Sequence, residues 1–233
     1  MRTPSLRLRD VQVDPYFQRY FDTRPMAPVR GELFSRPDTE QPTEQFFAAL
    51  ESHEHLQVLA WLLEVAAHVF TSTGMRSSIN VDAAIVSTPR TRNEFLRTAG
   101  LAACPVTFEF GEVPDGWTSE EMNRLLVQIR EREHECALDG FGRGGIDLAD
   151  LRNFRFDTVK IAGSVTVSLD RGLEFQEHME RIHETIVDAG MQPVVQGVES
   201  QANFQWLQEV GFTTFQGYWF SIPAPADGVS AHA

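Results

Sequence analysis

The sequence has little cysteine, little positive charge and no long uninterrupted apolar run. Its two cysteines, Cys104 and Cys136, form no CxxC pair, which excludes zinc ribbons and dithiol redox motifs and favours reduced, buried thiols. Lysine and arginine total 20 against 33 acidic residues, giving a net charge of −13. This balance excludes diffuse binding to nucleic acid or to an anionic membrane surface, although a metal ion or a few placed arginines can still hold a phosphate ligand.

Membrane-spanning and export segments are not expected. The most apolar stretch, residues 56–70, contains Glu64 and His68 and is shorter than a membrane span. Residues 1–11 are basic but lack the apolar centre of a signal peptide. The seven histidines form no HExxH or similar ligand spacing. We therefore predict a cytoplasmic protein with no membrane segment.

Strand and helix patterns instead alternate along the whole chain of 233 residues, without a linker that would divide it. We expect an irregular leader over residues 1–15, one domain over 16–223 and a flexible tail over 224–233. Eight strands are predicted, over residues 16–21, 28–35, 76–81, 106–112, 136–139, 157–161, 193–198 and 214–220. Helices are predicted over 42–51, 55–71, 91–99, 119–134, 148–153, 174–189 and 201–210. This order indicates an α/β fold of the (β/α)8 TIM-like barrel type.

Polar side chains recur near the carboxyl ends of the predicted strands. They share one strand face, and the apolar residues of the opposite parity would pack under the helices. The polar set is Asn80, Glu109, Asp139, Lys160 and Gln196. Between Asp139 and Lys160 the chain forms a glycine-rich loop and the short predicted helix 148–153, so these two side chains should lie next to each other. The carboxyl end of such a barrel is where its chemistry is found.

Seven segments in order resemble the EAL domain, the cyclic-di-GMP phosphodiesterase family. The segments are Glu32-Leu33-Phe34-Ser35-Arg36, Ser78-Ile79-Asn80-Val81, Glu109-Phe110-Gly111-Glu112, Asp139-Gly140-Phe141-Gly142-Arg143-Gly144, Val159-Lys160-Ile161-Ala162, Val195-Gln196-Gly197-Val198-Glu199 and Gln216-Gly217-Tyr218. The early Gln-Pro element of that family is matched only by Arg24-Pro25. The resemblance implies an EAL-type barrel with one antiparallel strand.

Residue roles follow from this resemblance. Glu32, Asn80, Glu109 and Asp139 would bind a divalent metal, and their oxygen donors suit Mg²⁺ or Mn²⁺. Lys160 would assist at the phosphate or at metal-bound water, and Arg36 would contact a phosphate. Glu199 and Gln216 would be supporting polar groups around the substrate.

Three departures from the family pattern fall on its catalytic chemistry. Gln196 stands where the family has its general-base glutamate, and an amide takes up no proton at neutral pH. Gly140 and Ala162 stand where the family has aspartates, one of them serving the second metal. In addition, Arg143 replaces a small hydroxyl residue of the family's loop. It could offset the remaining acidity or pair with a phosphate, but we expect a solvated loop arginine. We predict that hydrolysis is disabled and that the second metal site is lost.

Three hypotheses about function follow. The first is a catalytically impaired EAL regulator that acts through protein contacts, with a transcriptional regulator as one class of partner, and that also binds cyclic-di-GMP. The second is a slow metal-dependent phosphodiesterase that produces the linear dinucleotide with Lys160 or Glu199 as base. The third is a scaffold in which Leu33 and Phe34 block the nucleotide pocket. A homodimer is compatible with all three.

Overall fold

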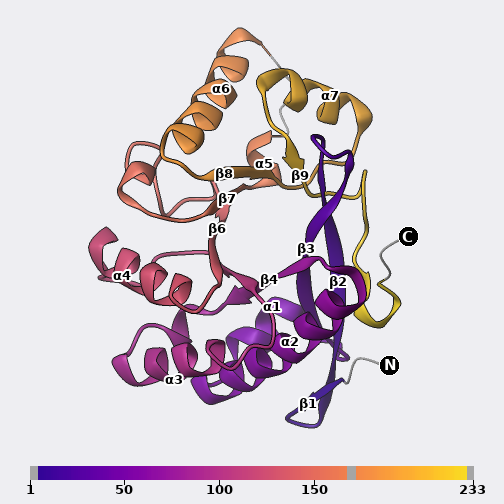
Figure 1. The fold of residues 1–233 in the computed structure, drawn as a ribbon, viewed down its shortest axis with the longest axis vertical. Helices are drawn as coiled ribbons and strands as arrows, with labels where there is room; N and C mark the ends of the chain where they lie inside the picture. Colours follow the sequence, from indigo (N-terminus) through magenta and orange to yellow (C-terminus); the bar gives the residue numbers. More distant parts are fainter. Residues whose placement is uncertain (1–4, 167–171, 230–233) are drawn as a thin grey trace.

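The computed structural model describes residues 5–166 and 172–229, which form a closed barrel of strands with helices outside it (Figure 1). The barrel strands are β2 (Val11–Asp22), β3 (Ala27–Pro37), β4 (Arg76–Val81), β5 (Val106–Phe110), β6 (Glu135–Phe141), β7 (Thr158–Ile161), β8 (Gln192–Val195) and β9 (Thr214–Phe215). β2 pairs antiparallel with both β3 and β9, which closes the barrel, and the other neighbours pair in parallel. The predicted barrel with one antiparallel strand is confirmed.

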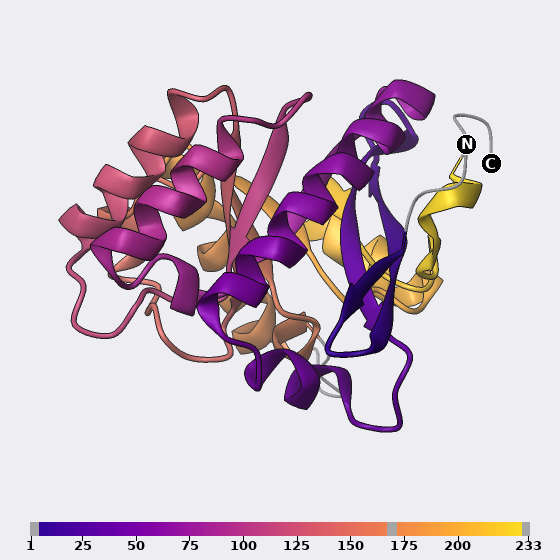
Figure 2. The same ribbon diagram turned by 90° about the horizontal axis from the view of Figure 1, so that it is seen from below.

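Helices cover the outside of the barrel in two groups. α2 (Ser52–Thr73), α3 (Pro89–Ala99) and α4 (Ser119–Arg130) run along one side, as Figure 2 shows, and α6 (Leu173–Asp188) and α7 (Gln201–Val210) lie on the other. Shorter elements are α1 (Thr43–Ala48), α5 (Gly163–Thr166) and the 3₁₀ turns η1 (Ala83–Ile85), η2 (Leu151–Asn153) and η3 (Ala226–Gly228). The helices leave both ends of the barrel to loops, where polar groups can gather.

Local sequence explains where the main helices begin and end. α2 begins with a capping box between Glu51 and Glu54 and ends at Gly74, whose φ of 73° is the left-handed conformation that glycine adopts readily. By length and composition α2 could also cross a membrane, contrary to the sequence-based estimate. Much of its apolar surface, including Val65 and Ala66, is buried against the rest of the protein, which accounts for its composition.

The outward faces of the strands form the core under the helices. Ile79, Phe108 and Val159 are fully buried, as their strand parity predicts. The Phe95 ring of α3 packs edge-on against Phe108, with ring centroids 5.2 Å apart. This core leaves the inward-facing side chains to determine what each end of the barrel can bind.

A series of hydrogen-bonded polar side chains fills the amino end of the barrel. Arg30 donates to Glu135 Oε2 at 3.1 Å and to Gln192 Oε1 at 3.2 Å. Gln192 donates to Thr214 Oγ1 at 3.0 Å, and Thr214 donates to Asp22 Oδ2 at 3.1 Å. Because these groups satisfy one another, the open polar site lies at the carboxyl end.

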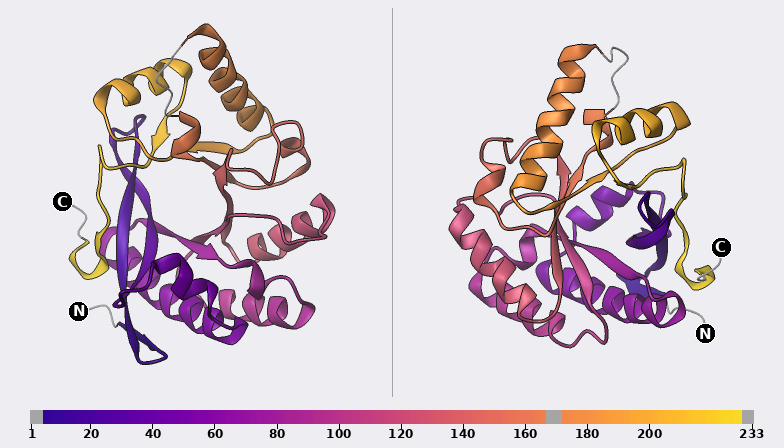
Figure 3. Two further views of the ribbon diagram at one scale, coloured as in Figure 1. Left: turned by 180° about the vertical axis from the view of Figure 1, so that it is seen from behind. Right: turned by 45° about the horizontal axis from the view of Figure 1, so that its top comes forward.

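The described parts of both predicted end segments contain regular structure. Within the predicted leader over residues 1–15, β1 (Leu6–Leu8) pairs with β2, and Val13 of β2 is fully buried, so residues 6–8 and 11–15 are not irregular. The predicted flexible tail contains β10 (Ala224–Pro225), which pairs with β2 along the outside of the barrel (Figure 3). Residues 1–4 and 230–233 lie outside the described residues.

Several predicted elements are shorter than expected, among them the strand predicted over 106–112 and the helix predicted over 119–134. The helix predicted over residues 148–153 is only the turn η2. β8 ends at Val195 before Gly197, whose φ is +69°. β9 ends at Phe215 because the chain then turns to pass Gly217 against the Val198 backbone.

Candidate functional site

Lys160 lies at the centre of the carboxyl end of the barrel, surrounded by three carboxylates from three other strands. Its Nζ is 2.8 Å from Glu32 Oε2, 2.5 Å from Glu109 Oε2 and 2.9 Å from Asp139 Oδ1. Lys160 is the single lysine of the chain and is fully buried. The predicted proximity of Asp139 and Lys160 is confirmed, but the ammonium binds carboxylates and faces no cavity.

Neighbouring donors satisfy the two glutamates of this cluster. Asn80 Nδ2 and Gln216 Nε2 each donate to Glu32 at 2.8 Å, to Oε1 and Oε2 respectively. The Tyr20 hydroxyl donates to Glu109 Oε1 at 2.8 Å. The cluster is thus held by hydrogen bonds on every glutamate oxygen, which fixes its geometry.

Burial is the largest single influence on the pKa values of Glu109 and Lys160. Burial and the adjacent Glu32 charge raise the pKa of Glu109 to about 8, although the Lys160 ammonium opposes the shift. Burial acts against the Lys160 charge, but Glu109, Glu32 and Asp139 together raise the pKa of Lys160 well above its usual value. Lys160 therefore stays protonated and cannot serve as a general base.

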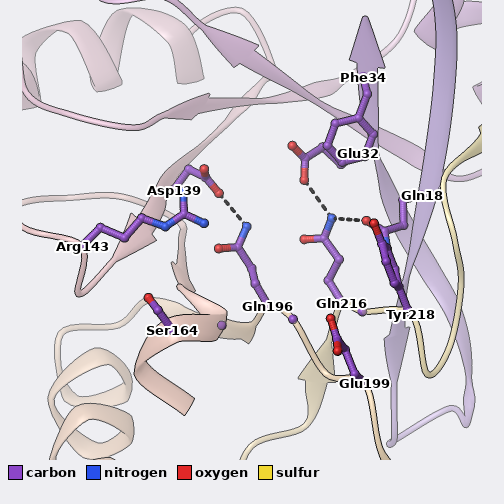
Figure 4. Close-up of a pocket in the computed structure, with 13 residues that line it drawn as sticks. Gln18, Glu32, Phe34, Asp139, Arg143, Ser164, Gln196, Glu199, Gln216 and Tyr218 are labelled. Carbon is purple, nitrogen blue, oxygen red and sulfur yellow. Dashed lines mark hydrogen bonds between the residues drawn. The ribbon is translucent and has the colours of Figure 1, made fainter. Parts of the chain in front are cut away.

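Gln196, at the position of the expected base, acts as a hydrogen-bond donor. Its Nε2 donates to Asp139 Oδ1 at 2.8 Å (Figure 4), and its Oε1 is buried without a hydrogen-bond partner among the described residues. Ala162 is fully buried, and Gly140 presents no side chain. Two of the three predicted losses of a carboxylate therefore adjoin Asp139, namely Gln196 through its hydrogen bond and Gly140 as the next residue of the chain.

Two cavities flank the cluster and share the side chain of Phe34. The first, of about 480 Å³, is lined by polar residues, namely Gln18, Glu32, Asp139, Arg143, Ser164, Gln196, Glu199, Gln216 and Tyr218 (Figure 4). The second, of about 680 Å³, lies between β3, α1 and α2 and is lined by both Arg36 and Asn80. Leu33 and Phe34 both line the second cavity, and Phe34 also lines the first, so their blocking of the nucleotide pocket stays a prediction.

The predicted metal ligands converge but are not arranged around an ion. Glu32, Glu109 and Asp139 direct oxygens at Lys160 Nζ, and Asn80 donates its amide to Glu32. In residues 5–166 and 172–229, no three histidine, cysteine, aspartate or glutamate side chains are placed to hold a metal. The donor types suit Mg²⁺ or Mn²⁺, yet this arrangement does not fit either ion. A second ion fits still less, since Gly140 and Ala162 offer no ligand.

The other predicted site residues divide between the two cavities. Gln196, Glu199 and Gln216 line the first, whereas Arg36 lines the second. Glu109 is buried beneath the cavities, although the resemblance made it a metal ligand. The metal-binding and catalytic roles of these residues therefore stay predictions.

Sequence reasoning missed two residues of β2. Gln18 lies directly opposite Glu32 in the β2–β3 register, accepts a hydrogen bond from Gln216 at 3.0 Å and lines the first cavity. Arg24, which was matched to the early Gln-Pro element, instead forms an ion pair with Asp22 at the other end of the barrel. Gln18 and Tyr20 are next-but-one neighbours in this strand, and this spacing could have indicated that both face the inside of the barrel.

Comparison with known proteins identifies the family. The EAL domain model matches residues 4–223. A cyclic di-GMP phosphodiesterase, NbdA of Pseudomonas aeruginosa, is 30% identical over 130 residues, which is 56% of this chain and 17% of that protein. The chain spans about a fifth of the length of such curated relatives.

Solved structures share the fold. A standalone EAL protein from Vibrio cholerae, solved in its c-di-GMP bound form, superposes with a TM-score of 0.78 at 22% identity, covering 95% of this chain and 96% of that one. Klebsiella pneumoniae BlrP1, in a manganese and cyclic-diGMP complex, gives a TM-score of 0.80 at 21% identity, covering 98% of this chain and 60% of that one. BlrP1 has also been solved with cyclic diGMP and no metal ions, where the TM-score is 0.71 at 18% identity, over 92% of this chain and 54% of that one. With the family model matching almost the full sequence, the chain belongs to the EAL domain family.

Proposed function

We propose that this EAL domain is catalytically impaired and acts in cyclic-di-GMP signalling as a nucleotide receptor that regulates a protein partner. The observation that carries the proposal is the hydrogen bond from Gln196 Nε2 to Asp139 Oδ1. In place of a base, the site has an amide that donates to a carboxylate and accepts no proton. Loss of a positioned base lowers a rate by about a hundred- to ten-thousand-fold.

The surroundings of Asp139 support the same conclusion. Gly140 and Ala162 supply no carboxylate, and the Lys160 ammonium lies among the three carboxylates that remain. The ammonium contacts one oxygen of each of these three side chains, where a metal ion would otherwise lie.

Nucleotide binding is supported by the two cavities beside the cluster. They are open and have volumes of about 480 and 680 Å³, and each has one arginine in its lining, Arg143 in the first and Arg36 in the second. BlrP1, which shares the fold, holds cyclic diGMP without metal ions. Loss of the metal site is thus compatible with retention of the ligand.

A protein partner is supported by exposed apolar side chains in the segment that contains Tyr218. Tyr218 is 63% exposed, Trp219 47% and Ile222 66%, and Tyr218 also lines the cavity. A surface of this kind is typical of a protein contact site. We propose a transcriptional regulator or a second copy of the chain as the partner, in the cytoplasm and away from membranes and nucleic acid.

Turnover of cyclic-di-GMP by purified protein, with Mg²⁺ and with Mn²⁺, tests this proposal. Chromatography of the products should show intact nucleotide under conditions in which an intact EAL enzyme converts it fully. The proposal fails if the linear dinucleotide appears at a comparable rate and the Glu32→Ala variant abolishes it.

A slow phosphodiesterase is the second candidate. It is favoured by the convergence of Glu32, Asn80, Glu109 and Asp139 at one end of the barrel. Since Lys160 stays protonated, the base would have to be Glu199, which is exposed and lines the first cavity. Residual turnover that Glu199→Gln removes would establish this alternative.

A further inference from the structure

Arg143 lies in a tight glycine-rich turn that leaves β6. Its backbone N–H donates to the Gly140 carbonyl at 3.1 Å, and Gly140 and Gly142 have φ values of +70° and +94°. A Cβ at Gly142 would lie 2.2 Å from Val165 Cγ2, so the turn packs directly against α5. This close packing fixes the loop beside the first cavity.

The Arg143 side chain folds back over Gly140. A Cβ built on Gly140 would lie 3.4 Å from Arg143 Cδ and 3.6 Å from Nε and Nη1. The guanidinium therefore covers the position at which the family pattern has an aspartate. A positively charged side chain thus occupies the place that a metal-binding carboxylate has in the family pattern.

The charged side chains around the first cavity are mostly acidic, and Arg143 is the exception. Among the described residues that line the first cavity, Glu32, Asp139 and Glu199 are acidic, and Arg143 is the sole arginine or lysine. Within residues 5–166 and 172–229, its guanidinium forms no ion pair. Lys160 is buried below and compensated by three carboxylates. Among the described residues that line this cavity, Arg143 is therefore the one side chain that can offer an entering anion a positive charge.

We infer that Arg143 binds a phosphodiester of the ligand and supplies the positive charge that a second metal ion would otherwise provide. This inference rests on the proposed function. A guanidinium matches two phosphate oxygens with parallel hydrogen bonds and stays charged at every physiological pH. Arg36, in the second cavity beyond Phe34, is placed to receive the other phosphate of a cyclic dinucleotide. Binding should therefore persist when divalent cations are removed.

Equilibrium titration with cyclic-di-GMP in EDTA tests the role of Arg143. The Arg143→Gln variant should bind about ten- to a hundredfold more weakly than the unaltered protein, since it loses a charge-assisted contact. Arg143→Lys should be intermediate, because an ammonium keeps the charge without the paired hydrogen bonds. Arg152→Gln removes the same charge from an exposed position on η2 outside both cavities and should bind as the unaltered protein does.

The outcomes separate this inference from the proposed function. Binding by Arg143→Gln within twofold of the unaltered protein would overturn the role of Arg143 and leave the receptor function intact. Binding that requires Mg²⁺ would do the same. Failure of the unaltered protein to bind with either EDTA or Mg²⁺ would overturn both.

A second pair of variants tests the same guanidinium through its neighbour. Gly140→Asp places a carboxylate beside Arg143, whereas Gly140→Asn adds nearly the same volume without charge, and both residue types tolerate positive φ better than most. In EDTA, Gly140→Asp should bind the nucleotide at least tenfold more weakly than Gly140→Asn, because the new carboxylate neutralises Arg143. Equal affinities of the two variants would contradict the inference.

Discussion

Gln196 shows how one atom changes the chemistry of a site. As a glutamate, this side chain would repel Asp139 unless a cation lay between them; as an amide, it donates to Asp139 Oδ1 at 2.8 Å. The amide therefore satisfies the carboxylate within the protein, and a metal is no longer needed for that purpose. The same exchange removes the proton acceptor that hydrolysis requires.

Restoring the glutamate should thus destabilise the protein before it restores activity. We expect Gln196→Glu to lower the free energy of unfolding in EDTA by about 1–3 kcal/mol, because it replaces a hydrogen bond by like-charge contact. Urea denaturation measures this change, and Gln205→Glu on the exposed face of α7 is the matched control. Equal stability of the two variants would contradict this account of Gln196.

Lys160 has a structural role that its sequence context did not reveal. Its removal leaves the buried Glu32 and Glu109 and the partly buried Asp139 without a cation. We expect Lys160→Met to lower the free energy of unfolding by about 3–5 kcal/mol. Addition of Glu32→Gln should recover part of this loss, because an amide needs no cation beside it. A loss below about 1 kcal/mol in urea denaturation would show that the cluster is not compensated by Lys160.

At the level of elements, the β2–β3 pair depends on one close approach. Gly31 lies opposite Arg19, and a Cβ there would be 2.4 Å from Phe17 Cζ and 2.5 Å from the Gln18 carbonyl oxygen. Since Gln18 and Glu32 follow in the same register, a shift here would move two lining residues of the first cavity. A change in the β2–β3 register would therefore change the lining of the first cavity.

Gly31→Ala should therefore destabilise the protein by about 1–3 kcal/mol, the usual effect of overpacking. Gly111→Ala is the control, because a Cβ there meets no atom within 4 Å. Thermal unfolding of both variants compares them directly. If Gly31→Ala unfolds at the same temperature as Gly111→Ala, the close approach described for β2 and β3 is incorrect.

The elements also show what the sequence could and could not predict. Alternating apolar and polar residues located all eight barrel strands and brought Asp139 and Lys160 together, because strand parity determines which side chains face inward. Strand β2 was placed but its start was missed, and Tyr20 and Gln18 were not recognised. Their importance depends on the antiparallel register with β3, which no local pattern specifies.

For the whole molecule, one buried histidine links the carboxyl end of α3 to the amino end of β5. His134 Nδ1 accepts from the Val106 N–H at 3.2 Å, and Nε2 lies 3.0 Å from the Ala99 carbonyl oxygen. Burial lowers the pKa of His134 below its ordinary value of 6.5, so the folded state holds the neutral ring. The unfolded chain takes up this proton at a higher pH than the folded protein does.

Stability should therefore fall as the pH drops below about 6.5, and the contribution of His134 should be fully present above that pH. We expect His134→Gln to show a smaller difference between its free energies of unfolding at pH 7 and pH 5 than the unaltered protein shows. Urea denaturation at both pH values measures the difference. An identical pH dependence would mean that His134 titrates normally in the folded protein.

At the scale of the whole molecule, we expect the protein to bind cyclic-di-GMP and not to consume it. The most direct test is calorimetric titration of cyclic-di-GMP into the protein with Mg²⁺ present, followed by chromatography of the nucleotide recovered from the calorimeter cell. We expect saturable binding heat and recovery of the intact cyclic nucleotide. Recovery of the linear dinucleotide, or a titration without binding heat, would contradict this expectation.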